Sequence, residues 1–155
     1  MKNILEENFL VDTNILIYYL DKNSESNEIA TTFFDFCREK KLSIFLAQQN
    51  ILELTSVLIK KYKINKKTVV AMIEDFLSSN LFRIIEPLPT TLFSFLTLLD
   101  KLEKPDIFDT FLAATTLDND INCILTNNPK DFKNIQGLEV LNLKDLEKIV
   151  GKNPA

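Results

Sequence analysis

Short apolar runs alternate along this chain with longer segments whose apolar residues recur every three or four positions. Five runs have the length and composition of buried strands, at residues 8–11, 42–47, 81–85, 122–125 and 138–141. The longer segments predict helices at 15–20, 27–40, 50–62, 65–79, 90–102, 105–117 and 143–150, with a helical turn at 129–133. This alternation predicts an α/β fold, a three-layer α/β/α sandwich with a central parallel sheet covered on both faces.

A single domain covering residues 1–155 is expected, since no repeat, low-complexity segment or linker interrupts the pattern. At this length a chain buries about 68–70% of its unfolded surface. In the helix predicted at 90–102, helical spacing places Leu92, Phe95, Leu96 and Leu99 on one face, which we expect to point inward.

The composition excludes several kinds of chemistry. The chain has no His, which rules out His-based acid–base catalysis and His-ligated zinc. Only two Gly are present, and neither dinucleotide-binding nor Walker A patterns occur. Cys37 and Cys123 are isolated and fit small core residues of a reduced, intracellular protein. The first seven residues lack the apolar core of a signal peptide, and no apolar stretch is long enough to span a bilayer. We expect a cytoplasmic protein without membrane contact.

Asp12 directly follows the buried run 9–11, at the point where a strand turns into a helix. Ligands of open α/β sheets gather at the carboxyl ends of the strands, so an ionised acid there is placed for chemistry. Asp is also a favoured helix cap, a role that would stabilise the protein by about 1 kcal/mol. Glu53 lies three residues after Asn50 and has the same ambiguity, because it could close a capping box.

Two further acidic segments could likewise belong to a functional site or simply stabilise the start of a helix. Asp106 and Asp109 are neighbours on one helix face and could complement the helix dipole. Asn128 could cap a turn that begins at Pro129, with Asp131 at its third position. Helices that cross back over a parallel sheet all begin at the same edge, so these caps are expected to converge.

Converging acids favour a bound cation. Two carboxylates about 4 Å apart repel by roughly 1 kcal/mol in water and about 4 kcal/mol in a partly buried site. Without His or Cys, the available oxygen ligands favour Mg²⁺ or Mn²⁺.

The net charge of -4 does not exclude a nucleic-acid partner, because an acidic metal site contributes to that total. A local cluster of lysines could contact phosphates, or it could be an ordinary solvated helix end and loop. Its members are Lys60, Lys61, Lys63, Lys66 and Lys67.

These residues resemble the PIN-domain family of metal-dependent nucleases, and in particular the VapC-type ribonuclease toxins of bacterial toxin–antitoxin pairs. The matching segments span nearly the whole chain in the family's order: 9–16 (FLVDTNIL), Glu53-Leu54, 109–115 (DTFLAAT) and 124–132 (ILTNNPKDF). Each segment is modest alone, and the ordered set is fairly specific.

The resemblance implies roles for individual residues. Asp12, Glu53 and Asp109 match the family's three recurrent acids and would ligate the metal. The fourth position, often Asp, is Asn128 here, and Asp131 three residues later could supply the missing charge as a catalytic residue. The remaining site residues would hold these acids in place from an outer shell of hydrogen bonds: Thr13, Asn14, Asp106, Thr126 and Asn128.

The resemblance also implies an activity and partners. The activity is hydrolysis of phosphodiester bonds in single-stranded RNA by a metal-activated water, with Mg²⁺ or Mn²⁺ as the cofactor. The partners are the RNA, a small antitoxin protein and a second copy of the chain in a homodimer.

Three alternatives stay open at this stage. The first is a PIN nuclease that works in RNA processing without an antitoxin. The second, motivated by Asn128, is a degenerate PIN scaffold that binds RNA or protein without cleavage. The third is a phosphatase-like fold with an aspartate nucleophile, which typically needs a second Asp where Asn14 stands.

Overall fold

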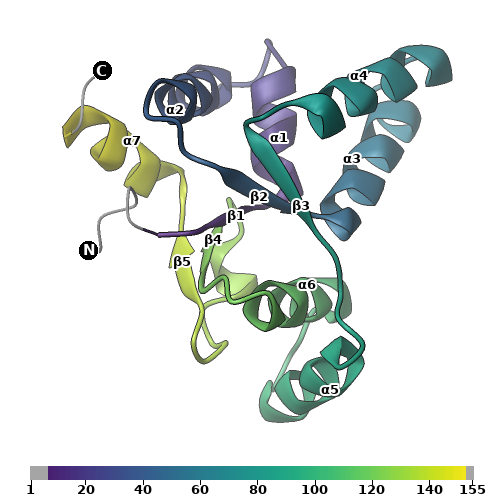
Figure 1. The fold of residues 1–155 in the computed structure, drawn as a ribbon, viewed down its shortest axis with the longest axis vertical. Coiled ribbons are helices and arrows are strands. Elements are labelled where there is room, and N and C mark those ends of the chain that lie inside the picture. Colours follow the sequence, from purple (N-terminus) through teal and green to yellow (C-terminus); the bar gives the residue numbers. More distant parts are fainter. Residues whose placement is uncertain (1–6, 153–155) are drawn as a thin grey trace.

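The computed structural model describes residues 7–152, and they form a parallel five-stranded sheet in the order β3-β2-β1-β4-β5 (Figure 1). Leu10 of β1 pairs with Phe45 on one side and with Ile124 on the other, so β1 is the central strand. The strands are β1 (Leu10–Val11), β2 (Ile44–Ala47), β3 (Phe82–Ile85), β4 (Cys123–Leu125) and β5 (Glu139–Leu141).

Five helices cover one face of this sheet, and their apolar stripes form the larger core with the strands. Phe33 and Phe34 of the second helix are fully buried, as its helical spacing predicts. These helices are α1 (Thr13–Leu20), α2 (Asn27–Glu39), α3 (Gln48–Lys60), α4 (Lys66–Ser78) and α7 (Leu143–Lys152).

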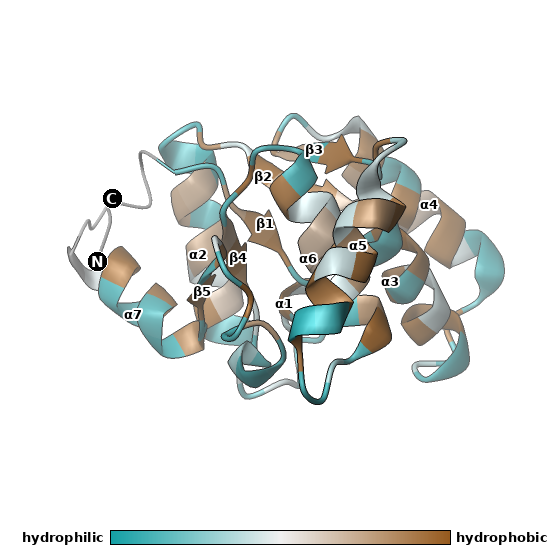
Figure 2. Cartoon of the chain, turned by 90° about the horizontal axis from the view of Figure 1, so that it is seen from below, coloured by the Kyte–Doolittle hydropathy of each residue, from teal (hydrophilic) through white to brown (hydrophobic). Residues whose placement is uncertain are grey.

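The opposite face is covered by α6 (Ile107–Asp118), which α5 (Thr91–Lys101) backs as an antiparallel hairpin (Figure 1). A smaller core joins Leu112 and Ala113 of α6 to Leu10 and Ile124 of the sheet. Figure 2 shows largely hydrophobic strands between helices that carry both hydrophobic and hydrophilic residues. The expected three-layer sandwich with a parallel central sheet is confirmed.

The predicted inward face of the fifth helix is partly wrong. Leu92 and Leu96 are 64% and 56% exposed, and Phe93 beside them is 74% exposed. Phe95 contacts Phe111 of α6, with ring centroids 5.8 Å apart, so it does face the hairpin partner. Because α5 packs on α6 and not on the sheet, it buries a narrower stripe than a helix in the core. It therefore leaves an apolar face uncovered.

The N-terminal segment in which the sequence predicts no signal peptide lies mostly outside the described residues. Within the described part of the chain, no helix is both long and apolar enough to cross a membrane.

Candidate active site

Asp12 lies at the point where the order of the strands reverses. The chain moves from central β1 outward through β2 and β3, and β4 then returns to the other side of β1. In such sheets the crevice beyond the carboxyl ends of the two strands at this switch point is the usual ligand site. Asp12 follows β1 there, and Thr126 follows β4.

Hydrogen bonds fix the Asp12 carboxylate, which is 6% exposed. One oxygen, Oδ1, accepts the Thr13 backbone N–H at 2.8 Å, which makes Asp12 the N-cap of α1. The other, Oδ2, accepts the Thr126 hydroxyl at 2.8 Å and the Asn14 amide at 3.3 Å. The Asn128 backbone N–H donates to the same Thr126 hydroxyl at 3.0 Å. Capping and site-building are therefore compatible roles for Asp12, and the expected contacts of Asn14 and Thr126 are present.

Glu53 does not close a capping box, because α3 begins two residues earlier than expected. Its N-cap is Ala47, whose N–H donates to the Asn50 side chain at 2.8 Å. Glu53 is therefore an interior residue of the helix, and capping does not explain it. Its Oε2 accepts the Thr13 hydroxyl at 2.9 Å, and that hydroxyl accepts the Asn50 amide at 3.2 Å. Gln49 donates to Oε1 at 2.9 Å.

Asp109 enters from the other face of the sheet, in the first turn of α6. Its backbone N–H donates to the Asp106 carboxylate at 3.0 Å, so Asp106 is the N-cap of this helix. The helix was expected to have Pro105 in its first turn, but it begins at Ile107, after the cap. Asp106 is exposed, whereas Asp109 is half-buried.

A cavity of about 370 Å³ brings the predicted residues together. Asn128 stands at the N-cap position of the turn that begins at Pro129, as expected, but it makes no side-chain cap hydrogen bond and lines this cavity. Asp131 ends the 3-10 turn Pro129–Asp131 and is not among the lining residues. We call this the acid cavity; it is lined by Asp12, Thr13, Asn14, Ile17, Glu53, Ser56, Val57, Asp109 and Asn128.

Burial and mutual repulsion disfavour the charged form of two of these acids. Burial raises the pKa of Asp12, against the hydrogen bonds from Thr126 and Thr13 that lower it. The pKa of Asp109 is raised from 3.8 to about 7, chiefly by burial and then by the negative charges of its neighbours, Asp12, Asp106, Asp131 and Glu53. Asp131 thus acts on the site through its charge, although it does not line the cavity.

The donor chemistry of the acid cavity fits a hard divalent cation. Its acids offer only oxygen ligands, which Mg²⁺ and Mn²⁺ prefer. A cation between Asp12 and Asp109 would also relieve the repulsion that raises the pKa of Asp109. Within residues 7–152, no three acidic side chains stand close enough in the described positions to ligate one ion. Asp12, Glu53 and Asp109 could therefore hold the ion only after side-chain adjustment.

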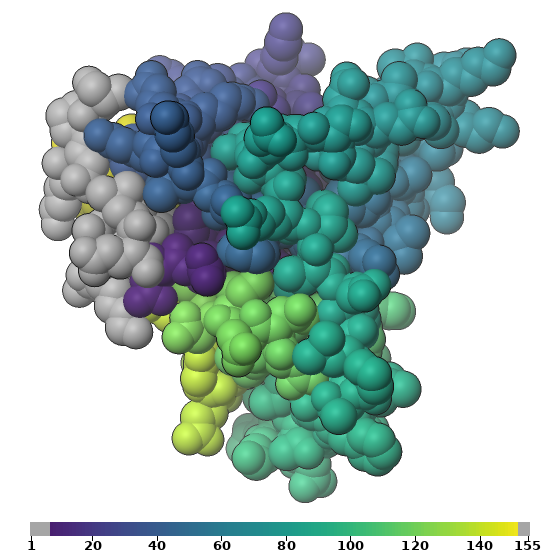
Figure 3. All heavy atoms as spheres, viewed as in Figure 1, coloured from purple at the N-terminus to yellow at the C-terminus, as the bar shows by residue number. Residues whose placement is uncertain are grey.

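The predicted lysine cluster lies outside this cavity. Lys60 ends α3, Lys61 and Lys63 follow it, and Lys66 and Lys67 form the first turn of α4. All five are exposed. Figure 3 shows the α3–α4 hairpin projecting away from the α5–α6 hairpin on this face of the molecule. Lys60 lies seven positions after Glu53 along α3, a rise of about 10 Å.

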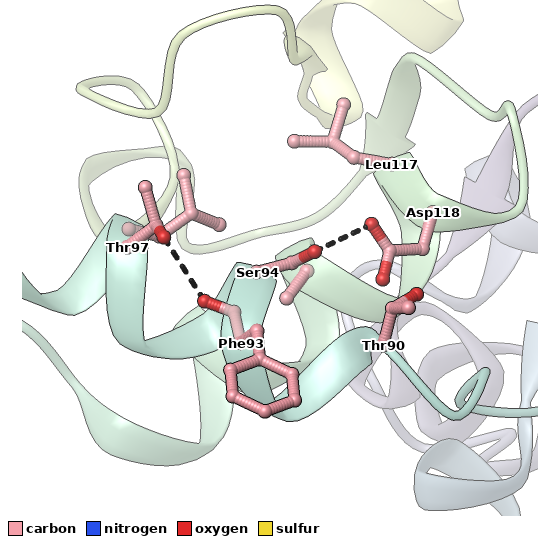
Figure 4. Close-up of a pocket in the computed structure, with 8 residues that line it drawn as sticks. Thr90, Phe93, Ser94, Thr97, Leu117 and Asp118 are labelled. Carbon is pink, nitrogen blue, oxygen red and sulfur yellow. Dashed lines mark hydrogen bonds between the residues drawn. The ribbon is translucent and has the colours of Figure 1, made fainter.

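A second cavity, of about 390 Å³, lies between α5 and α6 and contains none of the predicted residues (Figure 4). Asp118 at its wall accepts the hydroxyls of Ser94 at 2.9 Å and Thr91 at 2.8 Å. These bonds join the start of α5 to the end of α6 and satisfy the Asp118 carboxylate. Asp118 therefore has a structural role.

Comparison with known families identifies the class of this fold and site. The family model described as "PIN domain" matches residues 9–138, and the chain belongs to the PIN domain family. The resemblance inferred from the sequence is thereby confirmed. No curated protein matches the chain.

Solved structures share the fold. VapBC2 from Rickettsia felis, bound to a DNA fragment from its promoter, has a chain 22% identical with a TM-score of 0.68, covering 86% of this chain and 97% of that chain. A DNA-bound VapBC chain from Salmonella typhimurium is 16% identical with a TM-score of 0.68, covering 88% and 98%. VapC20 from Mycobacterium tuberculosis, a toxin that cleaves the Sarcin-Ricin loop, is 12% identical with a TM-score of 0.59, covering 76% and 87%.

Proposed function

We propose that this protein is a metal-dependent endoribonuclease that hydrolyses phosphodiester bonds of single-stranded RNA. The observation that carries the proposal is the convergence of Asp12, Glu53, Asp109 and Asn128 on one cavity at the switch point of the sheet. Membership of the PIN domain family supports a nuclease. Residues 1–155 would form one such domain.

The acids of the cavity would hold Mg²⁺ or Mn²⁺ through Asp12, Glu53 and Asp109. When bound, the cation lowers the pKa of a water molecule and neutralises charge on the scissile phosphate. Thr126 and Thr13 keep Asp12 oriented by donating to its two carboxylate oxygens. With no His in the chain, a His base is not available, and protons released by water pass to carboxylates or to solvent.

Residues around the three acids would have supporting roles in the site. Asp131 adds negative charge near Asp12 and Asp109 without lining the cavity, so we assign it an electrostatic role. Asn128 replaces the family's fourth acid and offers an amide in place of a carboxylate. Asp106 fixes the start of α6 and thereby Asp109. The lysine cluster, from Lys60 to Lys67, would contact the RNA backbone about 10 Å or more from the acids.

The biological role we propose is that of the toxin in a type II toxin–antitoxin pair. Structural neighbours named as VapBC complexes and as a toxin that cleaves the Sarcin-Ricin loop support this assignment. The partner would be a small antitoxin protein in the cytoplasm. The uncovered apolar face of α5, with Leu92, Phe93 and Leu96, is the surface we assign to a homodimer.

Incubation of the purified protein with end-labelled single-stranded RNA and Mn²⁺ tests the activity. We expect cleavage that stops with EDTA and in Asp12→Asn, and that leaves 5′-phosphate ends. A 2′-deoxy substitution at the cleaved position should leave cutting intact, because water and not the ribose hydroxyl is the nucleophile. Binding of RNA without cleavage would instead identify a degenerate scaffold.

A further inference from the structure

Gln49 connects the two helices that carry Glu53 and Asp109. Its side-chain Nε2 donates to Glu53 Oε1 at 2.9 Å, within α3, and to the backbone oxygen of Phe108 at 3.0 Å, on α6. Phe108 is the residue directly before Asp109. The Gln49 amide therefore links the Glu53 carboxylate, on one face of the sheet, to the backbone next to Asp109, on the opposite face.

The orientation of this amide is fixed by its partners. Glu53 and the Phe108 carbonyl are both acceptors, so only the NH₂ group of Gln49 can satisfy them. The flipped amide would put an oxygen against two oxygens. The remaining oxygen, Oε1, is buried and has no hydrogen-bond partner among the described residues. An unsatisfied buried acceptor costs stability, so folding alone does not favour this arrangement.

Both oxygens of the Glu53 carboxylate accept a hydrogen bond. Thr13, next to Asp12, donates to Oε2 at 2.9 Å, and Gln49 donates to Oε1. Each carboxylate oxygen keeps a lone pair for a further ligand. Without the Gln49 side chain, Glu53 would keep only the bond from Thr13, and α6 would lose this hydrogen bond to α3 beside Asp109.

We infer that Gln49 is a positioning residue that sets Glu53 relative to Asp109 by bridging α3 and α6. This inference rests on the proposed function, since Gln49 would act on two acids of the same acid cavity. It is a role separate from ligation: Gln49 does not line the cavity and acts through Glu53 and the backbone at Phe108.

Gln49→Met tests the bridge, because it keeps the length of the side chain and removes both donors. We expect RNA cleavage with Mn²⁺ to fall roughly 10-fold to 100-fold, as for other residues that orient metal ligands. The melting temperature of the metal-free protein should change little, because removal of the unsatisfied oxygen offsets the loss of the two hydrogen bonds. Gln49→Glu keeps the shape but places a carboxylate beside Glu53, and cleavage should fall at least as far.

Gln48→Met is the matched control. Gln48 is the exposed neighbour on the same helix turn, and its side-chain bond to Glu86 is long at 3.4 Å. Cleavage by this variant should match the wild type. If Gln49→Met also cleaves like the wild type, or if its lost activity follows a lower melting temperature, the positioning role is wrong.

A second measurement does not depend on activity. In the metal-free protein, the side-chain amide protons of Gln49 should exchange with solvent at least about 10-fold more slowly than those of Gln48. Equal rates would overturn the bridge even in an active enzyme. Wild-type protein that cleaves no RNA would refute the proposed function, and amide exchange alone would then decide whether Gln49 bridges the two helices.

Discussion

Replacing Asp109 by Asn should stabilise the metal-free protein at neutral and alkaline pH while abolishing cleavage. The pKa of Asp109 is raised from 3.8 to about 7 by burial and by the surrounding carboxylates. A carboxyl with a higher pKa in the folded state binds more protons when folded than when unfolded between these two values. The free energy of unfolding therefore falls as pH rises through this window.

The magnitude follows from the same values. At 1.36 kcal/mol per pKa unit, a change from 3.8 to about 7 corresponds to about 4 kcal/mol. Because Asp109 is only half-buried, solvent screening reduces this to about 2 kcal/mol. Loss of a negative charge at the N-terminus of α6 offsets about 0.3–1 kcal/mol. A net gain of about 1–2 kcal/mol corresponds to a melting temperature higher by about 2–8 °C.

Thermal unfolding in EDTA at pH 5 and pH 8 measures this gain. The gain of Asp109→Asn over the wild type should be largest at pH 8 and clearly smaller at pH 5, because it disappears only as the pH falls toward 3.8. Asp100→Asn is the control for loss of one carboxylate elsewhere, because Asp100 is exposed on α5 and lies outside the acid cavity. No gain at pH 8, or an equal gain at pH 5, would refute the electrostatic account of the site.

Three further outcomes are expected. The affinity of the wild type for Mn²⁺ should rise between pH 5.5 and 7.5, and binding should release more protons from the wild type than from Asp109→Asn. Calorimetry in buffers of different ionisation enthalpy measures this release, and an affinity independent of pH would contradict the prediction. Thr126→Val should lower cleavage roughly 10-fold to 100-fold, while Thr126→Ser, which keeps the hydroxyl that holds Asp12, retains most of it. The double variant Leu92→Asp/Leu96→Asp should be monomeric in light scattering, and an unchanged mass relative to a dimeric wild type would exclude this face as the interface.

The type and order of the elements could be predicted from the sequence, because apolar periodicity records which faces are buried. The ends of the helices are harder to predict from the sequence. At α3, the sequence predicts a start at Asn50, because Asn is a favoured cap residue. In the structure Asn50 is the third residue of the helix, and its side chain accepts the N–H of the N-cap residue Ala47. The inward face of α5 could not be predicted because apolar residues occur on most of its sides, and Leu92 and Leu96 are exposed.

The acids of the candidate site could be predicted, because the order of strands and helices along the chain is enough to bring them together. Asp12 follows the central strand, and Glu53 and Asp109 lie near the starts of helices at the same edge of the sheet, so topology brings them together. The part played by Gln49 was not predictable. Its bond to Phe108 joins residues 59 positions apart and depends on how closely α3 approaches α6.

Diffraction from crystals soaked in Mn²⁺ tests the central claim most directly, because manganese scatters anomalously and can be located without assuming its ligands. The account predicts an anomalous peak in the acid cavity, with oxygens of Asp12, Glu53 and Asp109 or their bound waters around it. The peak should be absent from Asp12→Asn crystals. A well-ordered acid cavity that stays without a peak at saturating Mn²⁺, or a peak only elsewhere on the protein, would contradict it.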